Sequence, residues 1–446
     1  MSDTRQHDGP APWRAALVAL VVAALFVLEG TTRNALFSGS WNSALAILNM
    51  GLISAVTALG VNMQWGYAGL FNAGVVGFLA LGGLGPVLVS TPPVAGAWAA
   101  GGPRVLLALV VGLATVGLAA QVWRRAPRGW RALGLLVVLV GGFALYRWLF
   151  DPAVMAIEAN DSAATGNIGG LGWPVLLSWP VGAALAAAAA WGVGKVALGL
   201  RSDYLSIATL GIGEIIVAVL RNEEWLSRGV KNMSGIPRPV PYELDLQNDP
   251  GFVGRATEWG LDPVTASGIW VKLLYAGLFG LVLVVLIVLA ELALKSPWGR
   301  MMRAIRDNEI AAAAMGKNVT GRHLQIFVIG SAVIGLAGAM MITLDGLLAP
   351  SSFNPLRYTF LVWVMVIVGG SGNNVGAALG AVLVWFLWIK VEVWGPAIMR
   401  LLTAPLPEGA LRDHLLGGAP HMRFIVMGVL LLIVLRFAPR GLVPER

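Results

Sequence analysis

Apolar runs about twenty residues long follow one another along most of this 446-residue chain. A helix needs about 20 mostly apolar residues to cross the hydrocarbon core of a bilayer, so each run predicts a membrane span. The runs predict an all-α, polytopic bundle of transmembrane helices with about 12 spans, or roughly 10–12 because the first, third and tenth runs are short or broken by glycine. The expected spans are residues 15–28, 42–63, 67–89, 104–122, 131–150, 173–199, 203–221, 268–294, 323–348, 357–370, 374–393 and 422–437.

Charged residues are scarce, at 12% of the chain against about 25% in an ordinary soluble domain, while 57% of the residues are hydrophobic. This composition excludes a soluble enzyme, a disordered chain and a secreted disulfide scaffold. The chain has no cysteine, which excludes disulfides, Cys-based zinc sites and thiol catalysis. Its four histidines are scattered at loops and span ends, so no metal site is expected. The net charge of +8 resides in short loops, where Lys and Arg act as orientation signals rather than nucleic-acid contacts.

The basic loops predict the orientation of the chain, because cytoplasmic loops carry an excess of Lys and Arg. The loop 295–322 holds six basic residues against two acids, and the turn 123–131 holds four arginines and no acid. Twelve spans place both of these, and both chain termini, on the cytoplasmic side. We therefore expect one transmembrane domain, 1–446, with an external loop at 222–267, a cytoplasmic loop at 295–322 and a hydrophobic hairpin within 100–170.

The cytoplasmic loop 295–322 has the pattern of a short helix. Ser296 can cap its N-terminus with Pro297 in the first turn, and Gly316 can end it in the left-handed conformation. Arginines at every third position form a basic stripe beside Met and Ile side chains. Such a helix suits a groove of another protein, although a solvated helix whose arginines only set the topology is the alternative. The sequence holds no nucleotide-binding loop of the type G-x-x-x-x-G-K-S/T, so any ATP must be hydrolysed by a partner.

The order of residues in this loop resembles that of a known family. Glu309-Ile310-Ala311-Ala312 followed by Gly316 is similar to the Glu-Ala-Ala…Gly coupling helix of ABC import permeases, which docks on the ATPase. Its flanks, Ser-Pro-x-Gly-Arg and Arg-Ala-Ile-Arg-x-x-Glu-Ile-Ala, look specifically like those of the branched-chain amino acid permeases. Further segments resemble the same family at residues 66–74, 200–216, 235–239, 368–372 and 438–444, the third of them only loosely.

The resemblance implies a permease subunit of an ATP-driven (ABC) importer, which forms the translocation pathway for branched-chain amino acids with a second permease subunit. It also implies two cytoplasmic ATPase subunits, an external solute-binding protein and a place in the bacterial inner membrane, in contact with lipid and not with nucleic acid. The partners would hydrolyse ATP, so neither a cofactor nor an enzymatic activity is expected in this chain. The resemblance assigns ATPase coupling to Arg303, Arg306, Glu309, Ala312 and Gly316.

Three departures from the family pattern stand out. The usual pattern lacks the hydrophobic hairpin at 100–170, Asn72 replaces a usual Ser, and Val217 stands where many members have Arg. The last two leave the solute open, so urea or short amides remain alternatives. From a different class, an ion-coupled secondary transporter would suit 12 spans, but such carriers often place several ionisable residues near mid-membrane. A membrane-embedded enzyme would need convergent catalytic groups at depth, and the sequence offers none.

Glu214 is the only acidic residue near the centre of an expected span. A carboxylate within the membrane is costly, so it should be paired, protonated or directed into a watery cavity. It either contacts a polar solute or hydrogen-bonds neighbouring groups in the bundle core, such as Thr209 one turn earlier. Other membrane-embedded charges lie within two turns of span ends and are expected to snorkel to the interface. These are Lys195, Lys272, Glu291, Asp345, Lys390 and Glu392.

Polar side chains beside glycine-rich breaks are further candidates for the pathway. Glycine-interrupted helices can expose carbonyl groups to a central solute site, although close helix packing is the commoner role of such glycines. Amide side chains can also bind a zwitterion without carrying charge. The residues expected to take part in translocation or substrate binding are Gly69, Asn72, Thr209, Glu214, Asn373 and Asn374.

Overall fold

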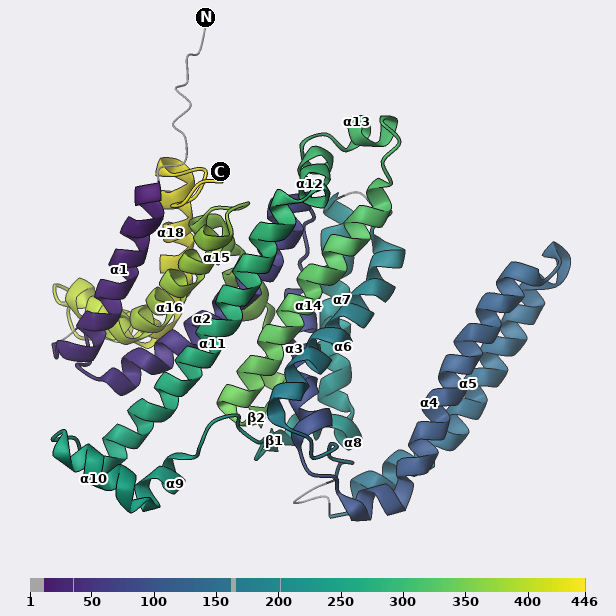
Figure 1. Ribbon diagram of the computed structural model, residues 1–446, viewed down its shortest axis with the longest axis horizontal. Helices are drawn as coiled ribbons and strands as arrows, with labels where there is room; N and C mark the ends of the chain where they lie inside the picture. Colours follow the sequence, from purple (N-terminus) through teal and green to yellow (C-terminus); the bar gives the residue numbers. More distant parts are fainter. Residues whose placement is uncertain (1–11, 35, 162–165, 201, 446) are drawn as a thin grey trace, which may run out of the picture.

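The computed structural model describes residues 12–34, 36–161, 166–200 and 202–445. Helices make up most of this described part (Figure 1). Ten of its helical stretches are long and apolar enough to cross a membrane. Two shorter apolar helices, Val75–Ser90 and Leu356–Gly369, correspond to the expected spans 67–89 and 357–370. The prediction of an all-α, polytopic bundle is therefore confirmed.

The elements have the following bounds. The α-helices are α1 (Pro12–Thr31), α2 (Trp41–Ala68), α3 (Val75–Ser90), α4 (Ala95–Arg125), α5 (Arg128–Ala159), α6 (Val175–Ala197), α7 (Ser202–Asn222), α8 (Glu224–Ser227), α9 (Glu243–Asn248), α10 (Pro250–Glu258), α11 (Pro263–Lys295), α12 (Pro297–Asp307), α13 (Glu309–Ala314), α14 (Val319–Asp345), α15 (Leu361–Gly369), α16 (Asn374–Thr403), α17 (Ala410–Gly417) and α18 (Met422–Phe437). The remaining elements are the 3-10 turns η1 (Gly229–Lys231), η2 (Pro350–Ser352) and η4 (Ala419–His421), the π-helical turn η3 (Leu356–Phe360), and the strands β1 (Met233–Ser234) and β2 (Leu347–Leu348).

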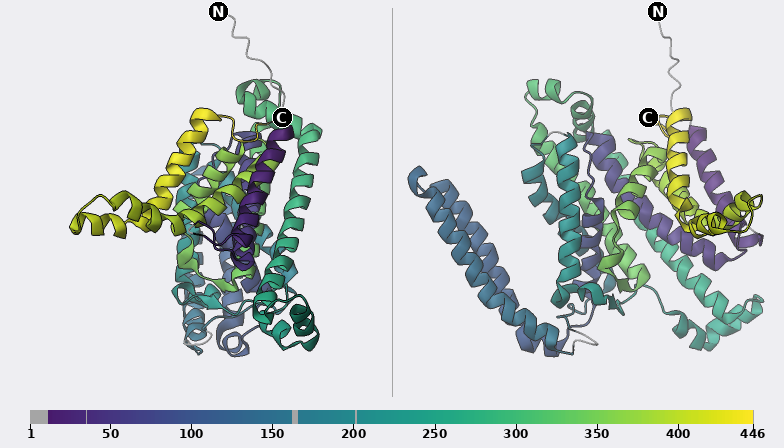
Figure 2. Two further views of the ribbon diagram at one scale, coloured as in Figure 1. Left: turned by 90° about the vertical axis from the view of Figure 1, so that its left-hand side faces the viewer. Right: turned by 180° about the vertical axis from the view of Figure 1, so that it is seen from behind.

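The two ends of the bundle carry different connections (Figures 1 and 2). One end holds α12, α13, the start of α1 and the C-terminal residues, and we call it the α12 end. The other end, the β1–β2 end, holds the antiparallel pair β1–β2, with Met233 opposite Leu348, together with α9 and α10. The loops 295–322 and 222–267 therefore lie at opposite ends of the molecule.

The centre of the bundle is built from α2, α14 and α16, whose most apolar windows are 72%, 78% and 72% buried. Glycines let α14 approach α3 closely. A Cβ on Gly82 would lie 2.0 Å from the carbonyl oxygen of Gly335, and a Cβ on Gly338 would lie 1.9 Å from that of Leu79. The two helices thus touch through their backbones, as small residues allow in membrane bundles.

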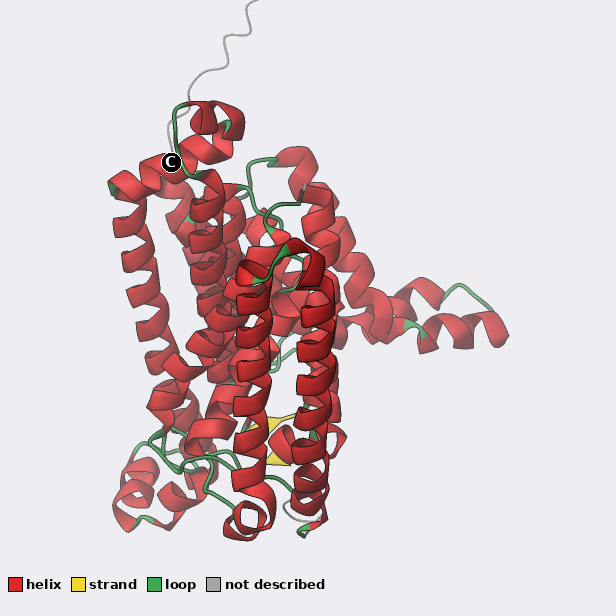
Figure 3. Ribbon diagram, turned by 90° about the vertical axis from the view of Figure 1, so that its right-hand side faces the viewer, coloured by secondary structure: helices red, strands yellow, loops and turns green. Residues whose placement is uncertain are grey.

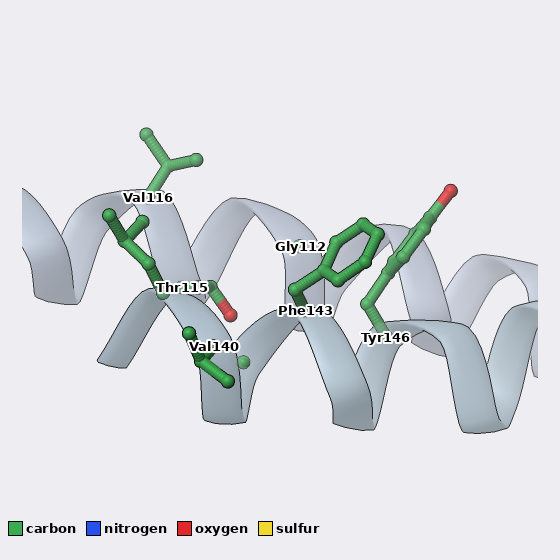
Figure 4. A pocket seen from close by; sticks show the side chains of 8 residues that line it. Gly112, Thr115, Val116, Val140, Phe143 and Tyr146 are labelled. Atoms are coloured by element: carbon green, nitrogen blue, oxygen red, sulfur yellow. The ribbon is translucent and has the colours of Figure 1, made fainter. Parts of the chain in front are cut away.

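The α4–α5 hairpin stands away from the bundle (Figures 1 and 2). Figure 3 views the molecule from the side on which the hairpin lies, so that it stands in front of the bundle. Only 11% and 6% of the most apolar windows of these two helices are buried. The hairpin is attached near its base, where Phe150 packs edge-on against Trp225 of α8, with ring centroids 5.7 Å apart. A groove of about 620 Å³ between the two helices is lined mainly by aliphatic and aromatic side chains, among them Phe143 and Tyr146, and by no charged one (Figure 4). This surface suits contact with lipid chains.

A buried ion pair joins α1 to α16. Lys390 Nζ lies 2.7 Å from Glu29 Oε2, and both side chains are almost completely buried. Ser38 donates a hydrogen bond to the other carboxylate oxygen of Glu29 at 2.7 Å. The expectation that Lys390 snorkels to the interface is therefore wrong, because a carboxylate on a neighbouring helix compensates its charge inside the bundle. Glu392 instead keeps a partly exposed contact with Arg423 at 3.0 Å.

Replacing only one member of this pair should destabilise the fold. The Lys390→Met substitution leaves the Glu29 carboxylate buried without its cation, and we expect the free energy of unfolding to fall by about 3–5 kcal/mol. Adding Glu29→Gln should restore most of the loss, because both charges are then gone. Equilibrium unfolding in mixed detergent micelles measures these differences.

The Glu392→Gln substitution serves as the control, since it breaks a partly exposed pair and should cost less than about 1 kcal/mol. A double variant no more stable than Lys390→Met alone would show that the buried pair does not act as a unit.

Candidate functional site

The chain between α2 and α3 is not helical. α2 ends at Ala68, where Gly69 adopts a left-handed conformation with φ of +70° that glycine reaches without strain. α3 begins only at Val75, and not at residue 67 as the apolar run predicted. Peptide groups in the break 69–74 are partly buried, and buried peptide groups need hydrogen-bond partners where water is excluded.

Asn72 holds this break in place from inside the bundle. Its Nδ2 donates to Gln64 Oε1 at 2.9 Å, and its Oδ1 accepts from the backbone N–H of Gly74 at 2.8 Å. Its own carbonyl accepts the indole N–H of Trp363 at 3.1 Å. The side chain is completely buried. Both ends of the Asn72 amide are therefore engaged by the protein itself in this conformation.

α7 packs directly against the break through Thr209. The Thr209 hydroxyl accepts the backbone N–H of Ala73 at 3.0 Å and donates to the carbonyl of Ser206 at 3.0 Å. A Cβ on Gly74 would lie 2.3 Å from the carbonyl oxygen of Thr209, so the two backbones are in contact. Thr209 thus couples α7 to the broken segment.

Glu214 lies on the other side of α7, facing away from the chain. Its side chain is exposed and forms no hydrogen bond or ion pair with the described residues. The alternative that Glu214 bonds Thr209 in the bundle core is wrong, because the Thr209 hydroxyl is occupied on the opposite face. Ile207 and Ile215 are also exposed around it, at 69% and 62%. Glu214 therefore lies on an apolar helix face that none of the described residues covers.

A polar network near the α12 end links three long helices. Asn374 Oδ1 accepts hydrogen bonds from Asn62 Nδ2, at 3.1 Å, and from the Tyr67 hydroxyl. Asn374 Nδ2 donates to Glu291 Oε1 at 2.9 Å, so Glu291 is engaged inside this network as well as lying near a span end. Asn62 Oδ1 in turn accepts the backbone N–H of Gly372 at 2.8 Å. The network ties α2, α11 and the start of α16 together.

Asn373 connects the start of α16 to the C-terminal segment. Its Oδ1 caps α16 by accepting the N–H of Gly376 at 3.0 Å, and its Nδ2 donates to the carbonyl of Pro444 at 3.0 Å. The N–H of Val443 also donates to the carbonyl of Gly369 at 3.0 Å. Residues near the end of the chain are thus strapped across the turn between α15 and α16.

The loop 295–322 contains two helices, where the sequence pattern predicted one. Ser296 caps α12 as expected, accepting the N–H of Gly299 at 3.4 Å. Asn308 interrupts the helix because its backbone is extended, with φ of −156°, and its side chain accepts the N–H of Ala311 at 2.9 Å. Asn308 thereby acts as the N-cap of α13. Gly316 follows α13 in the left-handed conformation, with φ of +77°, as predicted.

Arg306 anchors α12 to the bundle. Its Nη1 donates to the carbonyl of Gly66 in the last turn of α2 and to the carboxylate of Glu445, at 2.9 Å from each oxygen. Burial lowers the pKa of the Arg306 guanidinium, but the contact with Glu445 outweighs it, so the pKa is raised and the side chain stays charged. Met302 and Ile305 lie on the inner face of α12 and are almost completely buried.

α13 has a different character, because much of it is exposed. Glu309 is exposed, and Ile310 and Met315 are 83% and 78% exposed. Ala312 faces the chain instead and is 8% exposed, while Arg303 donates to the carbonyl of Leu294 at 3.4 Å. The five residues assigned to coupling thus divide into an exposed group on and after α13 and a group that attaches the loop to the bundle.

Sequence reasoning missed several members of these networks. Asn62 lies in the expected span 42–63 and Tyr67 begins the next one, with Gln64 between the two, but none of them was assigned a role. Glu445 was not assigned one either. Two amides, Asn62 and Gln64, in an otherwise apolar helix could have predicted a polar network, because buried polar groups need hydrogen-bond partners. The partners on α14 and α16 lie 263 or more residues away in the sequence, whereas Asn72 of the break is only eight residues from Gln64.

Comparison with known proteins identifies the family. Residues 153–435 match the family described as branched-chain amino acid transport system / permease component. Two curated relatives are the high-affinity branched-chain amino acid transport system permease proteins LivM of Escherichia coli, 29% identical over 317 residues, and of Salmonella typhimurium, 29% identical over 318 residues. Each alignment covers 70% of this chain and 64% of the relative.

A third relative is the probable branched-chain amino acid transport permease protein LivM of Methanocaldococcus jannaschii, 26% identical over 247 residues, or 55% of this chain and 61% of the relative. The chain thus spans less than two thirds of the length of the curated relatives that it matches. No solved structure matches it significantly. The family match covers more than half of the chain and includes α6, α7 and the α12–α13 loop. The chain belongs to the branched-chain amino acid transport permease family.

Proposed function

We propose that this chain is a permease subunit of an ATP-driven importer, and that it forms the translocation pathway for branched-chain amino acids with a second permease subunit. The observation that carries the proposal is the α12–α13 loop, in which a firmly anchored helix presents a short exposed one. α13 offers Ile310 and Met315 to a partner, and exposed apolar side chains on a short helix suit a groove in another protein. Two ATPase subunits at the α12 end would bind and hydrolyse the ATP.

The anchoring of α12 supports a way for ATPase movement to reach the pathway. Arg306 binds the last turn of α2 at Gly66, three residues before the break at Gly69. The same region contains Asn62 and Tyr67, which bond Asn374 at the start of α16. A displacement of α13 would thus be passed through α12 to the break and to α16, because these groups are packed and hydrogen-bonded as one unit.

The uncovered face of α7 supports the second permease subunit. An isolated carboxylate on a lipid-facing helix is expensive, so the face around Glu214 should be covered by protein or line a water-filled path. A second permease packed against Ile207 and Ile215 would enclose Glu214 between the two subunits. The pathway would then run beside α7 and the break that Asn72 and Thr209 hold.

The basic residues at the α12 end support an orientation of the chain in the membrane. The excess of Lys and Arg in the loop 295–322 supports a cytoplasmic position for the α12 end, with both termini, in a bacterial cell. The β1–β2 end, with the loop 222–267, would face outward and receive an external solute-binding protein. The hairpin at 100–170 would contribute mainly lipid contact.

Changes on α13 should uncouple uptake from ATP. The Glu309→Lys substitution reverses an exposed charge at the start of α13, and Gly316→Pro demands φ near −65° where the chain has +77°. We expect either variant to abolish ATP-stimulated leucine uptake by the reconstituted transporter without reducing the amount inserted in the membrane.

The control for this experiment is Glu408→Lys, which reverses a carboxylate that is 94% exposed in the loop before α17. Unchanged ATP-stimulated uptake in both α13 variants would refute the coupling assignment. Uptake driven by a proton gradient without ATPase subunits would refute the importer class and favour a secondary transporter.

A photo-crosslinking residue placed at Ile207 or Ile215 should join this chain to the second permease subunit. We expect a covalent heterodimer on gels after illumination of the assembled transporter in membranes. Leu113, which is 75% exposed on the hairpin, provides the matched control and should yield none. Crosslinks from Leu113 alone would place the second subunit on the hairpin and not on α7.

A further inference from the structure

A cavity of about 450 Å³ opens in the half of the bundle nearer the β1–β2 end. Its walls come from α2, α11, α14 and the segment from β2 to η3. The exposed residues Asp345 and Ser352 line it together with the buried Asn49 and Tyr358, so it leads from the surface into the bundle. This volume lies in the range of about 300–1,000 Å³ that is typical of small-molecule sites.

Arg357 is a cation without an anionic partner on the wall of this cavity. Its guanidinium lies 5.0 Å from the ring centroid of Tyr358 and 5.1 Å from that of Trp385. It forms no hydrogen bond or ion pair with the described residues, and its Nε is buried without a hydrogen-bond partner. Arg357 as a whole is half-buried, but buried polar atoms normally have a partner, so its unpartnered Nε beside a cavity points to an anionic ligand.

The same cavity also offers acceptors for a cation. Asn49 is completely buried, and its Nδ2 donates to the carbonyl of Lys272 at 3.0 Å. Its Oδ1 is buried and has no partner among the described residues. The Asp345 carboxylate lines the cavity as well and forms no ion pair with the described residues. Arg357 and Asp345 thus line one space without forming an ion pair. A second cation in the lining, Lys272, donates instead to Asn42 Oδ1 at 2.8 Å.

Apart from Lys272 and Ser352, the rest of the cavity lining is apolar, and little space continues beyond its inner end. Met50, Met341 and Ile342 form an apolar part of the cavity wall. The flexible methionines can adapt to an aliphatic side chain of a ligand. A second space continues inward past Met50, Met341, Arg357 and Tyr358, but its volume is only about 10 Å³. A solute entering from the β1–β2 end would therefore stop beside Arg357.

We propose that this cavity is the receiving site for a zwitterionic α-amino acid with a branched aliphatic side chain. Arg357 holds the carboxylate, Asn49 Oδ1 and Asp345 hold the ammonium group, and the methionines contact the side chain. The inference rests on the proposed import function and goes further, because it assigns the solute a position. It also separates amino acids from urea and short neutral amides, which would leave both charges unpaired.

Leucine analogues that lack one charged group test each half of the site. The assembled transporter, purified without its binding protein in lipid nanodiscs, is titrated with leucine, 4-methylpentanoate, which lacks the ammonium group, and 3-methylbutylamine, which lacks the carboxylate. We expect the wild type to bind leucine about 10- to 100-fold more tightly than either analogue, as hydrogen bonds to charged groups imply.

The Arg357→Gln substitution should weaken leucine binding by about 10- to 100-fold and abolish its preference over 3-methylbutylamine. Its preference over 4-methylpentanoate should remain. The Asp345→Asn substitution should instead abolish the preference for leucine over 4-methylpentanoate and keep the preference over 3-methylbutylamine. The matched control is Arg423→Gln, which removes another guanidinium packed on aromatic rings, Trp388 and Phe424, outside both cavities.

An Arg357→Gln variant that still prefers leucine over 3-methylbutylamine would overturn the assignment, even if ATP-driven leucine uptake stands. If Arg357→Gln fails to fold, Arg357→Lys retains the charge and should keep the preference for a carboxylate. Asp345→Asn tests the ammonium half of the site independently, because this exposed side chain can be replaced without disturbing the core. If the variant keeps the preference for leucine over 4-methylpentanoate, the assignment of Asp345 to the ammonium group is overturned. ATP-driven uptake of urea without leucine would instead refute the proposed function.

Discussion

A helix that breaks inside a membrane protein leaves peptide groups without their helical partners, and lipid offers no substitute for them. The structure meets this constraint with amide side chains. Asn72 satisfies the break after α2, Asn373 caps α16, and Asn374 joins α2 to α11. These bonds hold neighbouring segments together, because each amide contacts at least two parts of the chain. In this conformation both ends of each amide are engaged by the protein itself, while a part of these residues in translocation stays a prediction.

The loop 295–322 contacts the same region, at the end of α2 and the turn before α16. Arg306 binds the α2 carbonyl at Gly66, and a Cβ there would lie 2.6 Å from the N atom of Gly372. α12, the end of α2 and the turn before α16 thus meet with no space between them. Because packed interfaces shift between discrete arrangements and do not stretch continuously, a movement of α12 would change the contacts at all three places together.

Much of the fold could be predicted from the sequence because the membrane imposes a length on every apolar run. The twelve expected spans each correspond to a helix. Of the three runs flagged as short or broken, the third and tenth are short helices, whereas the first forms the 20-residue helix α1. Local chemistry also predicted the cap at Ser296 and the left-handed Gly316. The split at Asn308 was missed, although an Asn followed by Glu and alanines can cap a new helix.

The candidate site was harder to predict, because its members are brought together by tertiary contacts. Glu214 was identified as unusual, but the sequence could not tell which face of α7 it occupies. Lys390 was expected to lie at the membrane interface, because its partner Glu29 is 361 residues away in the sequence and only the fold brings the two together. Arg357 was not singled out at the start of a short span, because the sequence does not show whether a folded arginine has an acidic partner.

The hairpin has a consequence for how the protein fits its membrane. Helices of 31 and 32 residues are about 47 Å long at 1.5 Å per residue, well beyond a hydrocarbon core of about 30 Å. They can remain within the bilayer only by inclining, and they are attached to the bundle near one end alone. The hairpin can therefore change its tilt to follow bilayer thickness without straining the pathway helices, so differences in lipid chain length are absorbed at the periphery.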